Sequence, residues 1–375
     1  MAFDPNEASA PDSGIFGLPH TPLEARVVLL PVPWEATASY GVGTAQGPGA
    51  ILRASRQVDL FDVDTGRPYE QGIAMLVEAA QVVLWNEEAR ALVHSVRNPH
   101  PPTILQHETT AAPIPRGAAH DTAEPILHGS AHDTHARIAR VNALGEKLNH
   151  WVHSEAVRWL DAGKIFGVVG GDHSVSQGAI QAAAERHPAM GILHIDAHAD
   201  LRKAYEGFQY SHASILYNIF TGVANVGQIV QVGIRDLCDA EHALVQESKG
   251  RIVTHFDTAL AQAQFDGEPW RHVCERVVRD LPHQVYVTFD IDGLDPALCP
   301  HTGTPVPGGL SFAQANFLLR TLAVSGREIV GFDLTEVSPG PDAEQEWNAN
   351  VGARVLYKLI GWTLVTARVA TAGQQ

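Results

Sequence analysis

The sequence predicts an α/β protein whose central, mostly parallel sheet is covered by helices on both faces. Short apolar runs typical of buried strands recur from residue 164 to residue 333, and a segment with helical spacing follows nearly every run. Alternation of this kind is typical of parallel sheets with helices on both sides. The 375 residues, 45% of them hydrophobic, are enough to build one large core.

The beginning of the chain predicts an arm, a strand and a glycine-rich turn. Residues 1–25 are rich in Pro, Gly and acidic residues, so we expect an N-terminal surface arm ahead of one domain at 26–375. Residues 26–31 form an apolar run that predicts the first buried strand. The glycine-rich loop at 41–48 lacks the Gly-Lys-Ser/Thr ending of a phosphate-binding loop, and it leads into a predicted helix at 50–55.

The region of about 75–162 is predicted to be an insertion made of loop and helix. Residues 97–134 carry several prolines and histidines without sustained periodicity, which predicts a long loop. The histidine spacing there fits no standard metal site, so a solvated loop is the favoured interpretation. Residues 135–163 have apolar positions every three to four residues and predict a long helix.

The later strands and helices alternate. Strands are expected at residues 164–169, 191–195, 228–233, 251–254, 284–289 and 328–333. Helices are expected at residues 175–186, 212–221, 239–248, 269–280, 311–324 and 348–366. In open parallel sheets, ligands bind outside the carboxyl ends of the strands. Reactive or ligating side chains at those ends are therefore the first candidates for a functional site.

Two acidic motifs lie at predicted strand ends. Asp196-Ala-His-Ala-Asp200 follows the strand at 191–195, and Asp290-Ile-Asp292 follows the strand at 284–289. Alternate side chains of an extended segment point to the same face. We therefore expect Asp196, His198 and Asp200 to project together, and likewise Asp290 and Asp292.

Taken singly, each polar residue at a strand end has an ordinary explanation. His173, after the strand at 164–169, could be a core histidine; Asp172 could cap a helix, and Asp292 could anchor a turn. Taken together, several buried carboxylates are too costly unless cations compensate them. The six candidate ligands are His173, Asp196, His198, Asp200, Asp290 and Asp292. That number suits two ions that share carboxylates.

The donor set narrows the choice of metal and reaction. Oxygen-rich ligation with two imidazoles favours Mn²⁺, Ni²⁺, Co²⁺, Fe²⁺ or Zn²⁺ over Ca²⁺ and Mg²⁺. Two such ions, roughly 3.5 Å apart, lower the pKa of a water between them and supply hydroxide at neutral pH. The expected reaction is hydrolysis at a polarised carbon or phosphorus centre.

Four segments of this chain resemble the signatures of the ureohydrolases, the family of arginase, agmatinase, guanidinobutyrase and guanidine hydrolase. They are Gly170-Gly-Asp-His-Ser174, Asp196-Ala-His-Ala-Asp200, Phe289-Asp-Ile-Asp-Gly-Leu-Asp-Pro296 and Gly303-Thr-Pro-Val-Pro-Gly-Gly-Leu310. The resemblance covers roughly residues 26–62 and 164–360. It implies a three-layer α/β/α fold, a trimeric or hexameric assembly and a dinuclear metal centre.

The resemblance also implies a role for each matching residue. One ion would be held by His173, Asp196, Asp200 and Asp290, and the other by Asp196, His198, Asp290 and Asp292. Hydroxide between them would attack the guanidinium carbon, so that urea and an amine or ammonia are released. The catalytic residues implied are His212, Asp200 and Glu336.

His212 matches a proton-shuttling histidine, for which an ordinary pKa near 6.5 is suitable. Glu336 matches the carboxylate that pairs with the substrate guanidinium. Their ordinary alternatives are a histidine at the start of a helix and a structural acid at a strand end.

The substrate is the least determined property. Arginases usually carry an Asn shortly after the Asp-x-His-x-Asp motif, whereas this chain reads Leu201-Arg202-Lys203, and Ala213 stands where Gly is typical. Trp347 could cap a small cation by a cation–π contact, or it could be a surface residue packed beside the last helix. The segments at 15–19, 31–35, 57–62 and 347–354 most resemble the guanidine-hydrolase branch, often labelled agmatinase and often a nickel enzyme.

The sequence therefore predicts a metal-dependent hydrolase of linear amidines that uses two Ni²⁺ or Mn²⁺ ions. The expected substrate is a small cationic guanidino compound: free guanidine or a methylated or substituted guanidine such as metformin. The alternatives are an agmatinase or guanidinobutyrase acting on a longer guanidino-alkyl substrate, and, from another class, a non-catalytic metal-binding subunit. A metal-dependent deacetylase is disfavoured, because it lacks this pairing of motifs.

The composition of the chain limits the kinds of partner that we expect. A formal net charge of −16 disfavours nucleic acid, and no apolar run is long enough for a membrane span. Cys238, Cys274 and Cys299 have no paired spacing, and the N-terminal residues do not resemble a signal peptide, so a cytoplasmic protein is expected. The expected assembly is a homo-oligomer, alone or with a paralogous subunit.

Overall fold

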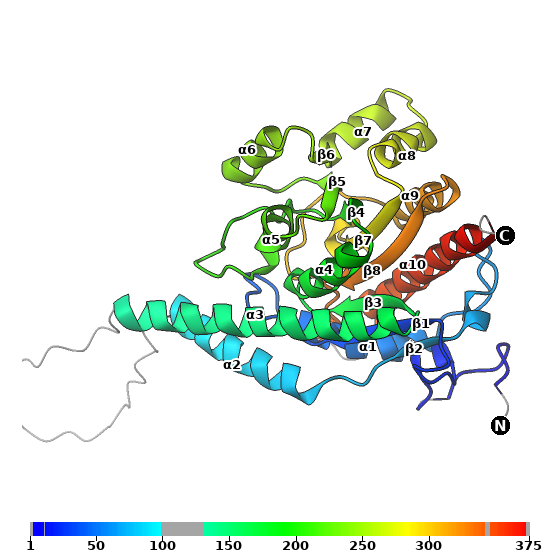
Figure 1. Ribbon diagram of the computed structural model, residues 1–375, viewed down its shortest axis with the longest axis horizontal. Helices are drawn as coiled ribbons and strands as arrows, with labels where there is room; N and C mark the ends of the chain where they lie inside the picture. The colour runs from blue at the N-terminus through cyan, green and yellow to red at the C-terminus, as the bar shows by residue number, and fades with distance from the viewer. Residues whose placement is uncertain (1–2, 11, 99–130, 342–345, 373–375) are drawn as a thin grey trace, which may run out of the picture.

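The computed structural model describes residues 3–10, 12–98, 131–341 and 346–372 (Figure 1). In these residues the strands form one eight-stranded sheet in the order β2-β1-β3-β8-β7-β4-β5-β6, and every pairing is parallel. The strands are β1 Val27–Val32, β2 Ile73–Met75, β3 Ile165–Gly170, β4 Met190–Ile195, β5 Val226–Ile234, β6 Ile252–Phe256, β7 Gln284–Asp290 and β8 Glu328–Thr335. The predicted parallel sheet is confirmed.

Helices cover both faces of the sheet, which confirms the three-layer α/β/α fold. Two separate buried cores lie between sheet and helices, one under α2–α6 and the other under α1 and α7–α10 (Figure 1). The helices are α1 Gly47–Ser55, α2 Ala80–Arg97, α3 Ala131–Asp161, α4 Gln177–Arg186, α5 Ile215–Gly222, α6 Asp239–Glu247, α7 Asp257–Phe265, α8 Trp270–Arg279, α9 Phe312–Val324 and α10 Trp347–Ala372.

The four central strands end at nearly the same level. Leu334 of β8 pairs with Val169 of β3 on one side and with Phe289 of β7 on the other, and Phe289 in turn pairs with Ile195 of β4. These strands are buried on both faces, which explains their nearly continuous apolar sequences. The residues that follow each strand are therefore brought together at one edge of the sheet.

The N-terminal arm is only partly a surface segment. Ile15, Phe16 and Leu18 are buried in the core under α1 and α10, and the main-chain N–H of Phe16 donates to the Ser55 hydroxyl at 2.8 Å. The expectation of a surface arm at 1–25 therefore has to be corrected for these residues, because an apolar block within a Pro- and Gly-rich segment can still be buried.

Several elements differ from the sequence-based expectation. β2, α2 and α7 were not predicted as separate elements, although α2 buries Val82, Ala89 and Val93 at helical spacing. The predicted loop at 97–134 falls largely at 99–130, outside the described residues, and α3 begins at Ala131. Among the helices described, none combines the length and apolar character that a membrane span requires.

Candidate metal centre

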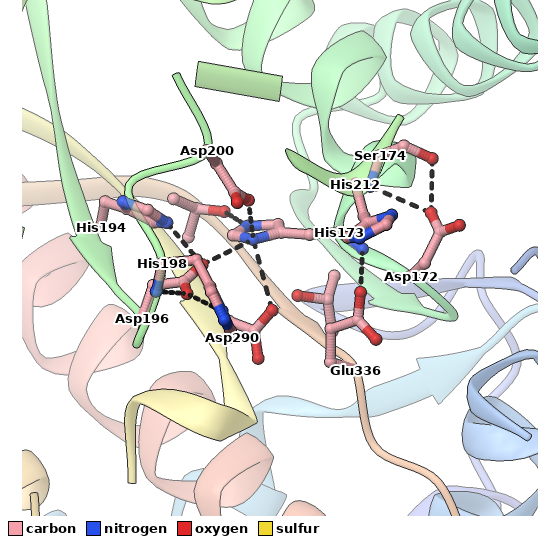
Figure 2. A network of polar contacts seen from close by, with 12 residues as sticks. Asp172, His173, Ser174, His194, Asp196, His198, Asp200, His212, Asp290 and Glu336 are labelled. Atoms are coloured by element: carbon pink, nitrogen blue, oxygen red, sulfur yellow. Dashed lines mark hydrogen bonds and ion pairs between the residues drawn. The ribbon is translucent and has the colours of Figure 1, made fainter. Parts of the chain in front are cut away.

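The candidate ligands gather at the carboxyl ends of β3, β7 and β4, and Glu336 follows β8, which lies between β3 and β7 in the sheet (Figure 2). His173 follows β3 in a short 3-10 turn, the Asp196–Asp200 motif follows β4, and Asp290 ends β7. β3 and β4 follow one another along the chain but are not neighbours in the sheet, because β8 and β7 lie between them. The site therefore lies where the strand order reverses. The fold thus unites motifs that are up to 119 residues apart, from His173 to Asp292.

His173 is buried and presents one ring nitrogen to three carboxylates. Its Nδ1 lies 3.0 Å from Asp196 Oδ2, 3.1 Å from Asp200 Oδ2 and 3.5 Å from Asp290 Oδ2. Its Nε2 lies 2.8 Å from the Thr288 hydroxyl, which itself donates to Asp333 Oδ1 at 2.8 Å. Because the Thr288 proton is used toward Asp333, the hydroxyl accepts from His173 Nε2–H, and Nδ1 is the atom available to a metal.

A second group forms around His198. Its Nδ1 lies 3.0 Å from Asp292 Oδ2 and 3.6 Å from Asp196 Oδ1. Asp292 is held in place by accepting from the Ala197 N–H at 3.0 Å, and its own N–H donates to Asp290 Oδ1 at 2.8 Å. The two acidic motifs are therefore linked through their main chains as well as their side chains.

The described residues contain two groups that could each hold an ion, with ligand atoms within 4.8 Å of one another. They are His173, His194, Asp196 and Asp200, and Asp196, His198 and Asp292. Asp196 belongs to both groups, as expected of a carboxylate shared by two ions. Asp290 belongs to neither, although its Oδ2 faces His173.

His194 was not singled out from the sequence. It lies inside the apolar run of β4 and is fully buried, with Nε2 2.8 Å from Asp196 Oδ2. The signal that could have found it is the strand period of two, because His194 precedes Asp196 by two residues and so points to the same face.

The charges of the centre fit cations. Burial and the neighbouring carboxylates Asp292 and Asp196 raise the pKa of Asp290 well above its ordinary value, and burial beside Asp196 raises the pKa of Asp200 to about 6. Although burial opposes a charged imidazole, Asp292 and Asp196 raise the pKa of His198 to about 12. Oxygen and imidazole donors packed this closely repel one another unless protons or metal ions lie between them, so the residues fit two divalent ions.

Two of the predicted site residues adopt a left-handed backbone. Asp200 has φ +55° and Glu336 has φ +61°, a region that residues other than glycine occupy at some cost. The Asp200 carbonyl accepts from the first N–H groups of α5, at Leu216 and Tyr217, and the Glu336 N–H donates to the Gly171 carbonyl. These contacts hold the two turns that aim the carboxylates at the centre.

Glu336 is buried beside His173. Its Oε1 accepts from the His173 main-chain N–H at 2.9 Å, and its Oε2 lies against Gly303, where an added Cβ would come within 2.8 Å. Burial and the nearby Asp172 raise the pKa of Glu336 well above its ordinary value. A cation placed beside this carboxyl would therefore favour its charged form strongly.

His212 lies in the 3-10 turn before α5, close to His198. Its Nδ1 is 3.1 Å from the Thr37 hydroxyl oxygen, which also accepts from the His212 main-chain N–H at 3.2 Å. Burial, with the charges of His198 and Arg97, lowers the pKa of His212 to about 3. The unperturbed pKa near 6.5 therefore does not apply to this buried ring, and the sequence did not show that the ring is buried.

A cavity of about 130 Å³ adjoins the two groups. Its lining includes His198, Asp200, His212, Arg202, Asp236 and Glu241. Trp347 is not among the lining residues: its side chain is 53% exposed and its indole N–H donates to the Ala297 carbonyl at 3.0 Å. This position corresponds to the alternative of a surface Trp at the start of the last helix, and a capping role for Trp347 stays a prediction.

Comparisons with known proteins agree with this geometry. The sequence model of the arginase family matches residues 25–361. The N(1)-aminopropylagmatine ureohydrolase of Thermus thermophilus is 33% identical over 349 residues, which are 92% of this chain and 94% of that protein. An agmatinase of Klebsiella pneumoniae is 34% identical over 209 residues, which are 55% of this chain and 63% of that protein.

Solved structures share the fold. The proclavaminate amidino hydrolase of Streptomyces clavuligerus has a TM-score of 0.69 at 22% identity, covering 96% of this chain and 100% of its own. The agmatine ureohydrolase of Thermoplasma volcanium has a TM-score of 0.66 at 21% identity, covering 95% and 96%. At this level of identity the likeness is one of architecture.

Proposed function

Since this chain belongs to the arginase family, whose members hydrolyse carbon–nitrogen bonds of guanidino compounds, we propose that it is a dinuclear-metal hydrolase that releases urea from a small guanidino cation. One observation carries the proposal. Two groups of imidazole and carboxylate ligands share Asp196 and adjoin a cavity lined by His198, Asp200 and His212.

The ligand sets proposed are those of the family motifs. His173, Asp196, Asp200 and Asp290 would hold one ion, and Asp196, His198, Asp290 and Asp292 the other. Bound divalent ions would lower the pKa of a bound water and so supply hydroxide at neutral pH. The ions proposed are Ni²⁺ or Mn²⁺, which accept mixed oxygen and imidazole ligation.

Glu336 is proposed to orient the guanidinium of the substrate. A guanidinium is planar and always charged, and a carboxylate is its natural hydrogen-bonding partner. Burial beside Asp172 keeps the pKa of Glu336 high, and an incoming cation would offset part of the electrostatic cost of ionising this carboxyl. Binding energy is thereby concentrated on the charged head of the substrate.

His212 is proposed to accept and pass on a proton. Burial lowers the pKa of His212 to about 3 in the metal-free protein, so the ring is neutral at neutral pH. Because a proton carrier works best with a pKa near the working pH, the proposal requires that this pKa rises in the substrate complex. Thr37 holds the ring through both the Nδ1 atom and the main-chain N–H. A proton taken up at the ring can then be delivered to the leaving nitrogen.

The cavity favours a substrate with one cationic group. A volume of about 130 Å³ is below the roughly 300–1,000 Å³ of pockets for larger ligands, which suits guanidine or a methylated guanidine. Arg202 places a positive charge in the lining, with its Nε 3.5 Å from Glu241 Oε2 and its guanidinium 5.3 Å from the centre of the Tyr205 ring. Glu241 is itself occupied, because it accepts from the N–H groups of Leu201 and Cys238.

A longer guanidino-alkyl amine is the second candidate. Two observations favour it: the relatives named aminopropylagmatine ureohydrolase and agmatinase, and Asp236 in the cavity lining. The Asp236 side chain is 65% exposed and lies 3.9 Å from His198 Nε2, where it could receive a remote ammonium.

Urea release from a panel of compounds tests the proposal. The panel is guanidine, methylguanidine, metformin, agmatine, aminopropylagmatine, 4-guanidinobutyrate and arginine, each with Ni²⁺- and with Mn²⁺-loaded protein. The highest kcat/KM is expected for guanidine or a methylated guanidine. A preference for agmatine or aminopropylagmatine would support the second candidate, whereas turnover of arginine alone would contradict both.

The assembly proposed is a homotrimer or homohexamer in the cytoplasm, alone or with a paralogous subunit. Sedimentation of the purified chain tests the first part. A monomeric chain with full urea release would contradict the need for assembly.

A further inference from the structure

His194 is a candidate ligand by distance, yet its surroundings assign it another role. The ring is fully buried in β4, with one nitrogen toward Asp196 and the other toward Gln231 of β5. A histidine can bind a metal only through a nitrogen that carries no proton, so the position of its proton decides between ligand and donor.

The orientation of the Gln231 amide can be read from its two other partners. Its Nε2 donates to the Ala199 carbonyl at 2.8 Å, and a carbonyl oxygen can only accept. Its Oε1 accepts from the Thr254 hydroxyl at 2.8 Å. The Ala199 contact requires the orientation that places the NH₂ group on the side of His194, and the Thr254 hydroxyl, which can donate, is compatible with it.

This orientation determines the tautomer of His194. Gln231 Nε2 lies 3.1 Å from His194 Nδ1, and its second N–H donates there. His194 Nδ1 is therefore an acceptor, and the ring proton is on Nε2. That Nε2–H lies 2.8 Å from Asp196 Oδ2 and donates to it.

We propose that His194 is a positioning residue that orients the shared carboxylate of Asp196, and that it is not a metal ligand; this rests on the proposed dinuclear centre. A neutral N–H donor fixes Oδ2 without adding a positive charge that would repel the ions. Ala199 also belongs to the Asp196–Asp200 motif, so Gln231 holds both the partner of Asp196 and the main chain of the motif. Thr254, Gln231, His194 and Asp196 thus form one hydrogen-bonded chain across β6, β5 and β4.

Variants at His194 separate the two roles. His194→Leu removes the donor, and a metal affinity lower by about 10- to 100-fold is expected, the usual cost of losing such a partner. His194→Gln keeps an N–H at a similar reach, and its affinity is expected to stay within roughly threefold of the wild type. An amide would not replace an imidazole that binds the metal directly, so an equal loss of metal affinity in both variants would overturn the proposal. An unchanged metal affinity of His194→Leu would overturn it as well.

Variants at Gln231 test the tautomer without touching the ring. Gln231→Glu places a carboxylate beside Nδ1 and draws a proton to that nitrogen. The ring then either loses the Nε2–H that donates to Asp196 or becomes a positively charged imidazolium beside the ions, so in both cases metal affinity is expected to fall by about 10-fold or more. Gln228→Glu makes the same change on the same strand, where the side chain donates to the exposed Gly250 carbonyl, and is expected to behave as wild type. Equal affinities of the two variants would contradict the proposal.

Competition with a chelator measures the metal affinity of each variant that folds. A crystal structure of Mn²⁺-loaded wild-type protein is a second test, and it needs no variant. His194 Nε2 is expected within hydrogen-bond distance of Asp196 and more than about 3 Å from either ion. A direct bond of about 2.1 Å to an ion would overturn the proposal. Wild-type protein that binds no metal would refute the proposed function itself, which distinguishes the two failures.

Discussion

The Thr37 hydroxyl oxygen lies 3.1 Å from Nδ1 of His212 and accepts from the main-chain N–H of the same residue at 3.2 Å. Thr37 therefore holds both the ring and the backbone of the proposed proton carrier. Arg97, at the end of α2, donates in turn to the Thr37 carbonyl at 3.0 Å. The position of His212 thus depends on an element that was not predicted from the sequence.

Thr37→Val removes the hydroxyl while preserving shape. We expect kcat for urea release to fall by roughly tenfold or more, because a displaced proton carrier loses its alignment with the substrate. Metal content measured by mass spectrometry should not change, since Thr37 contacts none of the proposed ligands in the described structure. Thr221→Val, on the exposed surface of α5, serves as the control. Loss of metal together with kcat would show that Thr37 acts on the centre as a whole.

Much of the fold and most of the proposed ligands could be predicted from the sequence. The central strands are nearly continuous apolar runs, and the strand period places Asp196, His198 and Asp200 on one face. Parallel pairing then brings the ends of different strands together. No such pattern marks β2 and α7, whereas α2 carries apolar residues at helical spacing and could have been predicted.

The parts of the site that could not be predicted depend on burial and on partners distant in sequence. The low pKa of His212 arises from burial and from the charges of His198 and Arg97. The role assigned to His194 depends on Gln231, 37 residues later, and a histidine in an apolar run gives no local sign of it. The exposure of Trp347 likewise depends on where α10 begins, and the sequence around Trp347 does not determine that point.

Asp290→Asn tests the ligand assignment. The amide still accepts from the Asp292 N–H but carries no charge, so we expect loss of metal affinity by at least about 100-fold and loss of urea release together. Because the variant also relieves repulsion among buried carboxylates, the metal-free protein should unfold at the same or a higher temperature. Asp295→Asn, an exposed acid on the same loop, is the matched control. Retention of both metal and activity in Asp290→Asn would refute the assignment.

Glu336→Gln tests substrate orientation. The amide oxygen can keep the hydrogen bond from the His173 N–H, while the charge that would face a guanidinium is lost. A charge-assisted hydrogen bond is worth about 1.5–3 kcal/mol, so kcat/KM for guanidine should fall by roughly 10- to 100-fold with metal content unchanged. Steady-state kinetics of the metal-loaded variant measure this. If Glu336→Gln kept the kcat/KM of the wild type, Glu336 would be a structural acid at a strand end and not a substrate-binding residue.

Metal affinity should increase with pH. Although burial opposes their charged forms, neighbouring carboxylates raise the pKa of His173 and His198, to about 12 for His198, so both rings hold protons at neutral pH in the metal-free protein. Binding requires neutral imidazoles and therefore releases protons, so affinity weakens as the pH falls. Calorimetry in two buffers of different ionisation enthalpy counts the protons released. Binding with no proton release at pH 7 would contradict these shifts.

Arg202→Ala tests how the cavity selects its substrate. Removing this positive charge should raise kcat/KM for agmatine relative to guanidine by about 10-fold, because the second cationic group of agmatine is no longer repelled. Lys203→Ala removes the neighbouring charge, which is not among the lining residues, and is the control. An unchanged ratio of the two substrates would mean that Arg202 does not act in selection.

Urea release measured during titration of metal-free protein with Mn²⁺ or Ni²⁺ tests the central claim most directly. The account predicts no urea without metal, and activity on a small guanidine that rises until two ions are bound per chain. Two ions bound without urea from any guanidino compound, or full activity in the metal-free protein, would contradict it.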